Sequence, residues 1–92
     1  MWEAAGETDF LQAVARIVAA QLPGDGERTP APLDVPLTDL GIDSLRTVRL
    51  LVQLERDLGI ELPPELITAD TFRTVRTVAD AARRVSGAQQ AD

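Results

Sequence analysis

Residues 40–45 read Leu-Gly-Ile-Asp-Ser-Leu, and a run with the apolar spacing of a helix, 44–58, begins inside this stretch. Gly41 allows the chain to turn, and Asp43 is of a type that caps helix N-termini. Ser44 is then the first residue of the predicted helix. The first N–H groups of a helix are unpaired and its dipole is positive there, so a phosphate ester on Ser44 would be favoured electrostatically. An Asp-Ser pair can also serve only as a cap, and the pair alone leaves both interpretations open.

The composition excludes several classes of function. The chain has 92 residues, which predicts a single domain too small for a deep active-site cleft. It has no Cys and no His, so zinc sites and Ser-His or Cys-His catalytic pairs are excluded, and we expect neither a catalytic residue nor a metal site. The net charge of −6 argues against binding nucleic acid. No segment has the length and apolarity of a membrane span or the basic start of a signal peptide, so we expect a cytoplasmic protein that does not bind a membrane. We also expect a monomer.

The first half of the chain predicts one helix and one long loop. Apolar residues repeat at helical spacing after Thr8, a candidate N-cap, and the helix should end near Leu22 because Pro23 and Gly24 follow. Charges, prolines and glycine over 25–36 then predict a long loop, and loops of this length are often functional. Three apolar residues are expected to pin this loop to the core: Leu33, Val35 and Leu37.

The second half predicts three more helices. The helix over 44–58 should stop at Gly59 in a left-handed conformation, with Ile60 packing back after it. A short helix is expected near 65–68, and a last helix is expected to run from a cap at Thr74 to Ser86-Gly87. The predicted fold is therefore all-α, a small bundle of three main helices and one short helix. We assign residues 1–7 to a flexible leader, 8–86 to the domain and 87–92 to a flexible tail.

The helix over 44–58 carries two apolar stripes. At 100° per residue one face holds Thr47, Leu50, Leu51, Leu54 and Leu58, and this face belongs in the core. Leu45, Val48 and Val52 fall on another side and cannot share that surface. Two interpretations stay open: the loop over 25–36 covers these three residues, or they form an exposed strip beside Ser44 that a partner protein covers.

Gly41-Ile42-Asp43-Ser44-Leu45, followed by about four turns of amphipathic helix, resembles the phosphopantetheine attachment site of the acyl and peptidyl carrier proteins. The resemblance extends from about Leu33 to Val85 and is to the free-standing type. It implies a 4'-phosphopantetheine arm on Ser44, installed by a phosphopantetheinyl transferase. It also implies that Asp43 caps the helix and helps to hold the magnesium ion of the transferase complex. Partners would include an acyl-loading enzyme and downstream synthase or tailoring enzymes.

The same resemblance assigns further residues to partner docking. These are Leu45, Arg46, Val48, Arg49, Val52 and Phe72. Phe72 falls where a bulky apolar residue lines the mouth of the space between the second and third helices, although ordinary core packing would also explain it. Fatty-acid carriers usually have an acidic second helix, whereas residues 44–58 carry three arginines against Glu55 and Asp57. We therefore expect partners with a less basic or acidic docking patch, unless Arg46 and Arg49 pair with acids of the loop over 25–36.

The leading hypothesis is a carrier that tethers acyl groups as thioesters in polyketide or other specialised-metabolite biosynthesis. Aspartate before the serine is common in acyl carriers and favours this class. One alternative is an aminoacyl or peptidyl carrier of a nonribosomal peptide pathway, because that class also uses aspartate. Another is an unmodified adaptor that only binds proteins. An enzyme is not expected, because no base adjoins Ser44 in the sequence.

Overall fold

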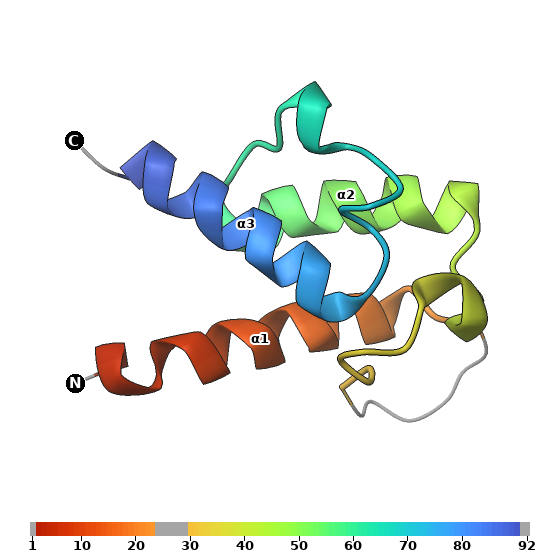
Figure 1. Ribbon diagram of the computed structural model, residues 1–92, viewed down its shortest axis with the longest axis horizontal. Helices are drawn as coiled ribbons and strands as arrows, with labels where there is room; N and C mark the ends of the chain where they lie inside the picture. The colour runs from red at the N-terminus through yellow and green to blue at the C-terminus, as the bar shows by residue number, and fades with distance from the viewer. Residues whose placement is uncertain (1, 24–29, 91–92) are drawn as a thin grey trace.

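The computed structural model describes residues 2–23 and 30–90, with side chains described over 10–23 and 30–87. Its regular structure comprises three α-helices and two single 3₁₀ turns, in the order α1 (Trp2–Ala20), η1 (Leu37–Leu40), α2 (Ser44–Leu58), η2 (Pro64–Leu66) and α3 (Val75–Gln90). The predicted all-α bundle of three main helices and one short helix is confirmed (Figure 1).

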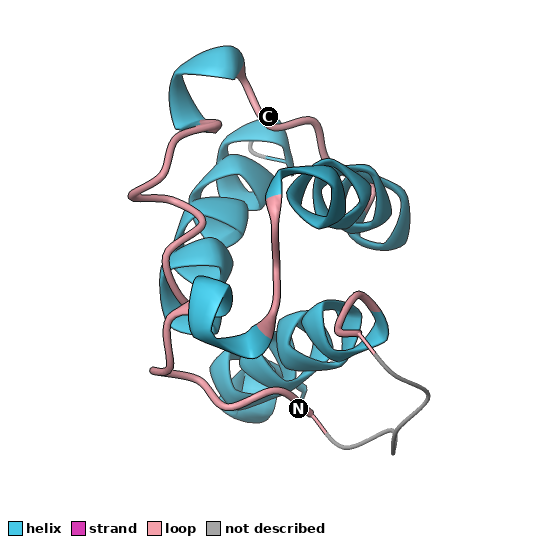
Figure 2. Ribbon diagram, turned by 90° about the vertical axis from the view of Figure 1, so that its right-hand side faces the viewer, coloured by secondary structure: helices cyan, strands magenta, loops and turns pink. Residues whose placement is uncertain are grey.

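The three helices are arranged so that α1 contacts both α2 and α3. The start of α1 and the end of α3 lie at one end of the molecule, and the start of α2 lies at the other (Figure 1). Figure 2 views the molecule from this second end, where a loop leads from η1 into α2. Ser44 is thus held far from both ends of the described chain.

A shared aliphatic core holds the bundle together. It draws on all three helices, with these residues less than 2% exposed: Val14, Val18, Leu37, Leu50, Leu54, Val75 and Val78. Ala15 and Ala79 are fully buried as well, so small side chains fill the core where aromatic ones are scarce. Removing a buried leucine side chain such as that of Leu50 typically costs about 2–5 kcal/mol. The core therefore fixes the position of α2, which carries the candidate site.

A second cluster closes the end of the bundle where α2 stops. Gly59 adopts a left-handed conformation (φ 65°) and Ile60 packs back against α3, as predicted. Its other buried members are Leu62, Ala82 and Val85, and Phe10, Leu58 and Phe72 pack against both clusters. Glycine suits this position because residues with a side chain rarely adopt a positive φ.

The cap predicted for α3 is confirmed and is reciprocal. Thr74 Oγ1 accepts from the N–H of Thr77 (3.2 Å), while Thr77 Oγ1 accepts from the N–H of Thr74 (3.0 Å). This is the capping-box arrangement with threonine in the place usually taken by Glu or Gln. The start of α3 is therefore fixed locally.

The second half of the predicted loop is pinned to the bundle, and its first half, 25–29, lies outside the described residues. Leu37 is buried and Leu33 packs against the core, as predicted, whereas Val35 is only half-buried. Main-chain bonds add to this: the N–H of Ala31 donates to the Ala15 carbonyl (3.1 Å) and that of Leu37 to the Arg73 carbonyl (2.8 Å). The loop is thus fastened to α1 and to the approach to α3.

The start predicted for α1 and the end predicted for α3 were wrong. The helix α1 begins at Trp2 instead of Thr8, while its end at Ala20 lies near the predicted Leu22. The helix α3 continues through Ser86-Gly87 to Gln90. Most residues in both extensions are good helix formers, and one glycine inside a helix costs only about 1 kcal/mol, too little to end it. The flexibility expected of 1–7 and 87–92 stays a prediction, and residues 1, 91 and 92 lie outside the described residues.

Two smaller differences concern the short elements. The short helix expected near 65–68 is a 3₁₀ turn at Pro64–Leu66, and Pro63 and Pro64 fix the backbone where it starts. The turn η1 was not predicted, and it places Leu37 in the core immediately before the candidate site.

Candidate functional site

The backbone leading to Ser44 is shaped by a short series of local bonds. The turn η1 ends at Gly41, which has φ 98° and donates its N–H to the carbonyls of Leu37 and Thr38. Ile42 is buried and donates its N–H to the Leu37 carbonyl (3.0 Å). Asp43 follows in an extended conformation and its carboxylate accepts from the N–H of Arg46 (2.9 Å), which confirms the predicted N-cap. The chain therefore reaches Ser44 on a defined path.

This path is also held against the end of α1. Arg46 reaches back to donate from Nη1 to the carbonyl oxygen of Gln21 (2.9 Å). Gly41 lies so close to Pro23 that a Cβ at this glycine would stand 2.7 Å from the proline Cγ. A carbonyl near a helix C-terminus is a favourable partner for a guanidinium, because the helix dipole is negative there. The bond and the close approach together fasten the start of α2 to the end of α1.

Ser44 is exposed and is the first residue of α2. The N–H groups of Ser44 and Leu45 have no acceptor within the helix, because the first turn has no preceding carbonyl. Together with the positive end of the helix dipole they favour an anionic group on the serine oxygen. No histidine exists in the chain to take a proton from this hydroxyl. Ser44 is thus suited to be modified by another protein and not to act as a nucleophile by itself.

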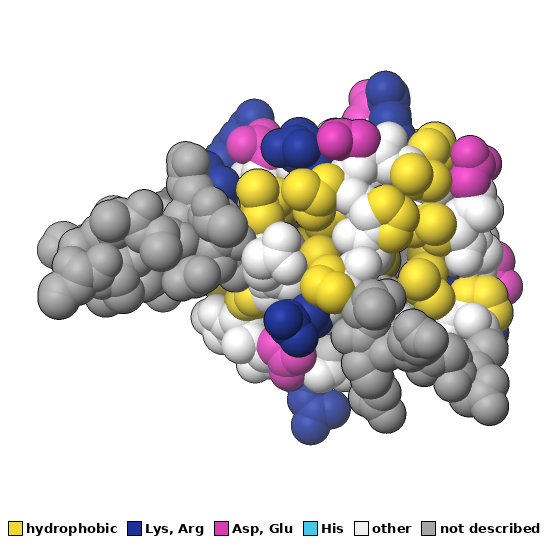
Figure 3. Space-filling view, turned by 90° about the horizontal axis from the view of Figure 1, so that it is seen from below, with side chains coloured by type: hydrophobic (Ala, Val, Ile, Leu, Met, Phe, Trp, Pro, Cys, Tyr) yellow, Lys and Arg dark blue, Asp and Glu magenta, His cyan; other side chains and the backbone are white. Residues whose placement is uncertain are grey.

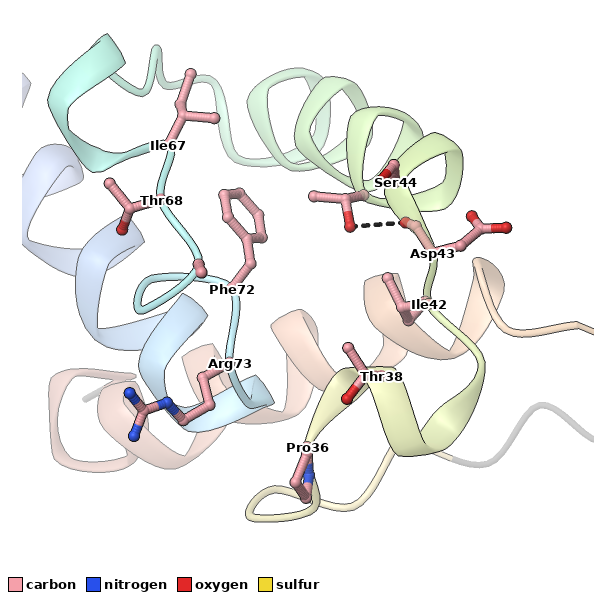
Figure 4. Close-up of a pocket in the computed structure, with 11 residues that line it drawn as sticks. Pro36, Thr38, Ile42, Asp43, Ser44, Ile67, Thr68, Phe72 and Arg73 are labelled. Atoms are coloured by element: carbon pink, nitrogen blue, oxygen red, sulfur yellow. Dashed lines mark hydrogen bonds between the residues drawn. The ribbon is translucent and has the colours of Figure 1, made fainter.

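A hollow of about 500 Å³ opens beside Ser44. Ile42 and Thr47 line it on the α2 side, and Ile67, Thr68 and Phe72 line it on the side of the connection to α3 (Figure 4). The Thr47 hydroxyl is already bonded to the Asp43 carbonyl (2.8 Å), so this wall offers the hollow mainly methyl groups. The hollow therefore suits a largely apolar group attached near Ser44.

Phe72 fulfils both interpretations proposed for it. Its ring lies between Ile67 and the start of α2 and lines the hollow (Figure 4). It is also half-buried and packs against both core clusters. One face of the hollow is thus made by a side chain that also contributes to the core.

The second stripe of α2 is exposed. Leu45, Val48 and Val52 keep 60%, 57% and 46% of their surface, so the described part of the loop, 30–36, does not cover them. Ile67, also exposed, was not singled out from the sequence, because a single isoleucine in an irregular segment has no periodicity. Large apolar side chains gathered on the surface are typical of a contact site.

Arg46 and Arg49 differ in their surroundings. Arg46 is half-buried and bonded to Gln21, so it is less exposed than expected, and its role in docking stays a prediction. Arg49 is exposed. Neither pairs with a described acid of the loop: Asp34 bonds Arg76 instead, and Asp25 and Glu27 lie outside the described residues. The partner of Arg46 is a main-chain carbonyl, for which the sequence carries no signal.

The residues around Ser44 fit a phosphopantetheine group. An exposed hydroxyl at a helix N-terminus can carry the phosphate, and the adjoining hollow can take part of a flexible arm or its cargo. No three His, Cys, Asp or Glu side chains come together as a metal site in the described parts of the chain. None of the described helices has the combined length and hydropathy needed to cross a membrane.

Comparison with known proteins identifies the family. A family model described as a phosphopantetheine attachment site matches residues 12–82. The chain belongs to the phosphopantetheine-binding carrier proteins. It is 38% identical over 74 residues to an acyl carrier protein of Thermosynechococcus vestitus, and the aligned residues cover 80% of this chain and 88% of that protein. It is 34% identical over 84 residues to nodulation protein F of Rhizobium leguminosarum bv. viciae, with 86% of each chain covered.

A third relative is a much longer protein. The carrier protein is 42% identical over 57 residues to a 5-methyl-1-naphthoate synthase of Streptomyces sahachiroi, of which those residues make up 3%. The cofactor of this carrier protein is phosphopantetheine, and the protein is not an enzyme. Carrier proteins are acted upon by phosphopantetheinyl transferases and by synthase enzymes.

Proposed function

We propose that this carrier protein holds phosphopantetheine on Ser44 and carries acyl groups as thioesters on the terminal thiol of that arm. In the first step the Ser44 oxygen attacks the phosphorus of coenzyme A that bears the pantetheine. A new oxygen–phosphorus bond forms, the bond to the nucleotide phosphate breaks, and the transferase takes the serine proton. When bound, the arm would supply a thiol that can hold an acyl group as a thioester: the sulfur–carbon bond would form as the donor's bond to the acyl group breaks, and the donor's leaving group would take the thiol proton. The chain's own residues present the hydroxyl and hold its surroundings.

The observation that supports this assignment most directly is the contrast between the chain's two serines. Ser44 is exposed at the start of α2, where the helix dipole favours a phosphate. Ser86 is half-buried in the last turns of α3, where the dipole disfavours a phosphate. Only one of the two positions suits the modification.

We propose specialised-metabolite biosynthesis of the polyketide type as the setting. The match to a segment of the Streptomyces sahachiroi synthase supports this, because the name of that protein describes the making of an aromatic acid. The arginines of α2 also suit partners dedicated to this carrier, since charge governs encounter and partner choice. An aminoacyl carrier and an unmodified adaptor are the alternatives that the experiments below distinguish.

Intact-mass measurement after incubation with coenzyme A and a broad-range phosphopantetheinyl transferase tests the assignment. The parent protein and Ser86→Ala should each gain the mass of one arm, and Ser44→Ala should gain none. Circular dichroism should show that Ser44→Ala keeps its helices. A persistent gain in Ser44→Ala would move the attachment elsewhere, and no gain in the folded parent would favour the adaptor.

The hollow lined by Phe72 leads to a prediction about cargo. Because the transferase can also transfer acylated arms, forms bearing a short and a longer acyl chain can be made from the matching acyl coenzymes A. We expect the Phe72 amide signal in NMR spectra to differ between the unloaded and the longer-chain forms, while that of Arg84 on α3 stays constant. An aminoacyl arm compared in the same way would show whether the hollow prefers apolar cargo. Identical Phe72 signals in all forms would leave this ring a core residue only.

A further inference from the structure

The apolar strip of α2 has exposed arginines along one edge. Turning the helix at 100° per residue places Leu45, Val48 and Val52 within an arc of about 60°. Arg49 and Arg56 fall next to this arc, on the side away from Ser44, and both are exposed. Among the described side chains, 10–23 and 30–87, neither arginine forms an ion pair.

The two acidic residues of α2 both accept hydrogen bonds within the protein. Glu55, on the other edge of the strip, is half-buried and its Oε2 accepts from the N–H of Leu62 (2.9 Å). Asp57 lies beyond Gln53, whose amide donates to its Oδ1 (2.9 Å). Two exposed arginines therefore lie along one edge of the strip and one half-buried carboxylate along the other, so the exposed charge beside the strip is positive although the whole chain has a net charge of −6.

We propose that this strip and its two arginines bind a protein partner whose contact face is apolar at its centre and acidic beside it. The proposal deepens the proposed function, since the surface adjoins the Ser44 arm that such a partner would act on. At physiological ionic strength charges more than about 8 Å apart are largely screened. A docked acidic partner would therefore be attracted by the adjacent arginines more strongly than it is repelled by the distant acids of the chain. The same local charge disfavours a basic partner in this orientation.

A pair of synthetic amphipathic helical peptides can test the chemistry of the surface. Both carry the same leucines, and their flanking positions are glutamate in one and lysine in the other. Each is titrated into the unmodified, isotope-labelled carrier protein. We expect the glutamate peptide to shift amide signals between Leu45 and Arg56, and to bind at least about fivefold more tightly than the lysine peptide, the ratio that two exposed ion pairs would produce.

Matched charge variants make this test specific. Arg49→Glu combined with Arg56→Glu should reverse the preference between the peptides. Arg16→Glu combined with Arg84→Glu changes the net charge equally at exposed positions on α1 and α3, and should keep the preference of the parent. Equal binding of both peptides, shifts that map outside α2, or an equal loss in the control variant would each overturn the proposal.

The outcome is independent of the attachment experiment, because the peptides are titrated into protein that carries no arm. Selective binding of the glutamate peptide in a protein that the transferase cannot modify would support the surface and contradict the assignment of Ser44. Modification of Ser44 without peptide preference would support the attachment and contradict the acidic partner.

Discussion

Arg46 shows how one side chain can link two helices near the candidate attachment residue. Its guanidinium extends from the first turn of α2 to the Gln21 carbonyl just beyond the end of α1, at 2.9 Å. Its backbone N–H is bonded to the Asp43 carboxylate, so the same residue takes part in the N-cap. Arg49, one turn later, is exposed. Two arginines on one helix therefore have different tasks, one internal to the fold and one facing solvent.

We predict that Arg46→Ala lowers the free energy of unfolding by about 1 kcal/mol, because a half-buried charged hydrogen bond is lost. Arg49→Ala is the matched control and should change it by less than about 0.5 kcal/mol. Urea unfolding followed by circular dichroism measures both. Equal effects in the two variants would show that the bond between Arg46 and Gln21 contributes nothing measurable to stability.

The start of α2 could be predicted at the residue level because its signals are local. Asp43 lies only three residues before Arg46, whose N–H donates to the Asp43 carboxylate, and Gly41 precedes Asp43 in the turn. The bond from Arg46 to Gln21 joins residues 25 positions apart, and its acceptor belongs to the main chain. Side-chain type alone could therefore not distinguish Arg46 from Arg49.

Among the elements, α2 has sharp ends and the outer helices do not. A carboxylate cap begins α2 and a left-handed glycine ends it, so both bounds follow from short-range chemistry. The helix α1 runs through Gly6, although it was predicted to begin at Thr8. The helix α3 runs through Gly87, where it was predicted to end. A glycine stops a helix only when the chain also turns there, and that depends on what the next residues contact.

This difference predicts opposite effects of alanine at two glycines. Gly87 lies inside α3 with nothing within 4 Å of a Cβ built there, so Gly87→Ala should stabilise the protein by about 0.5–1 kcal/mol. Gly59 also has free space, but its φ is 65°, so Gly59→Ala should destabilise by about 1 kcal/mol. Thermal unfolding of both variants measures the signs. Destabilisation by Gly87→Ala would place the end of α3 at this glycine.

On the scale of the whole molecule, the loop that precedes η1 is bonded to both α1 and α3. Asp34 receives two bonds from Arg76, at 2.8 and 3.1 Å, and the N–H of Arg76 donates to the Leu33 carbonyl (3.1 Å). The loop thereby joins the first turn of α3, while Ala31 joins it to α1. Figure 3 shows this side of the molecule, with apolar side chains gathered at its centre and charged ones around them.

The ion pair predicts a pH dependence at the acidic end. The hydrogen bond from Arg76 lowers the pKa of Asp34, desolvation opposes this, and the attraction of the guanidinium adds to it. A carboxyl whose pKa is lower in the folded state stabilises the fold above its unfolded pKa, near 3.9, and this contribution is lost as pH falls through the folded pKa. Both side chains are exposed, so the effect should be small.

Melting temperatures of the parent protein and Asp34→Asn, measured from pH 7 to pH 2, test this. The parent should melt higher at pH 7, and the difference should shrink as pH falls below about 4. Asp39→Asn, which removes one negative charge at an exposed position of η1, is the control for the change in net charge. A constant difference between the parent and Asp34→Asn across the range would contradict the role of the ion pair.

The amino-acid sequence by itself determined the helical fold, the bounds and caps of α2, and the two stripes on that helix, because these rest on spacing and on contacts within a few residues. It also singled out Ser44, since an Asp-Ser pair at a predicted helix start is a local pattern.

Only the tertiary structure decided which apolar stripe stays exposed, where α1 and α3 end, and what the arginines contact. Leu45 and Leu54 are the same residue type on the same helix, and the packing of α1 and α3 leaves the first exposed and buries the second. The pairs Arg46–Gln21 and Asp34–Arg76 join residues 25 and 42 positions apart. Contacts at such separations depend on how the helices pack, which no short stretch of sequence encodes.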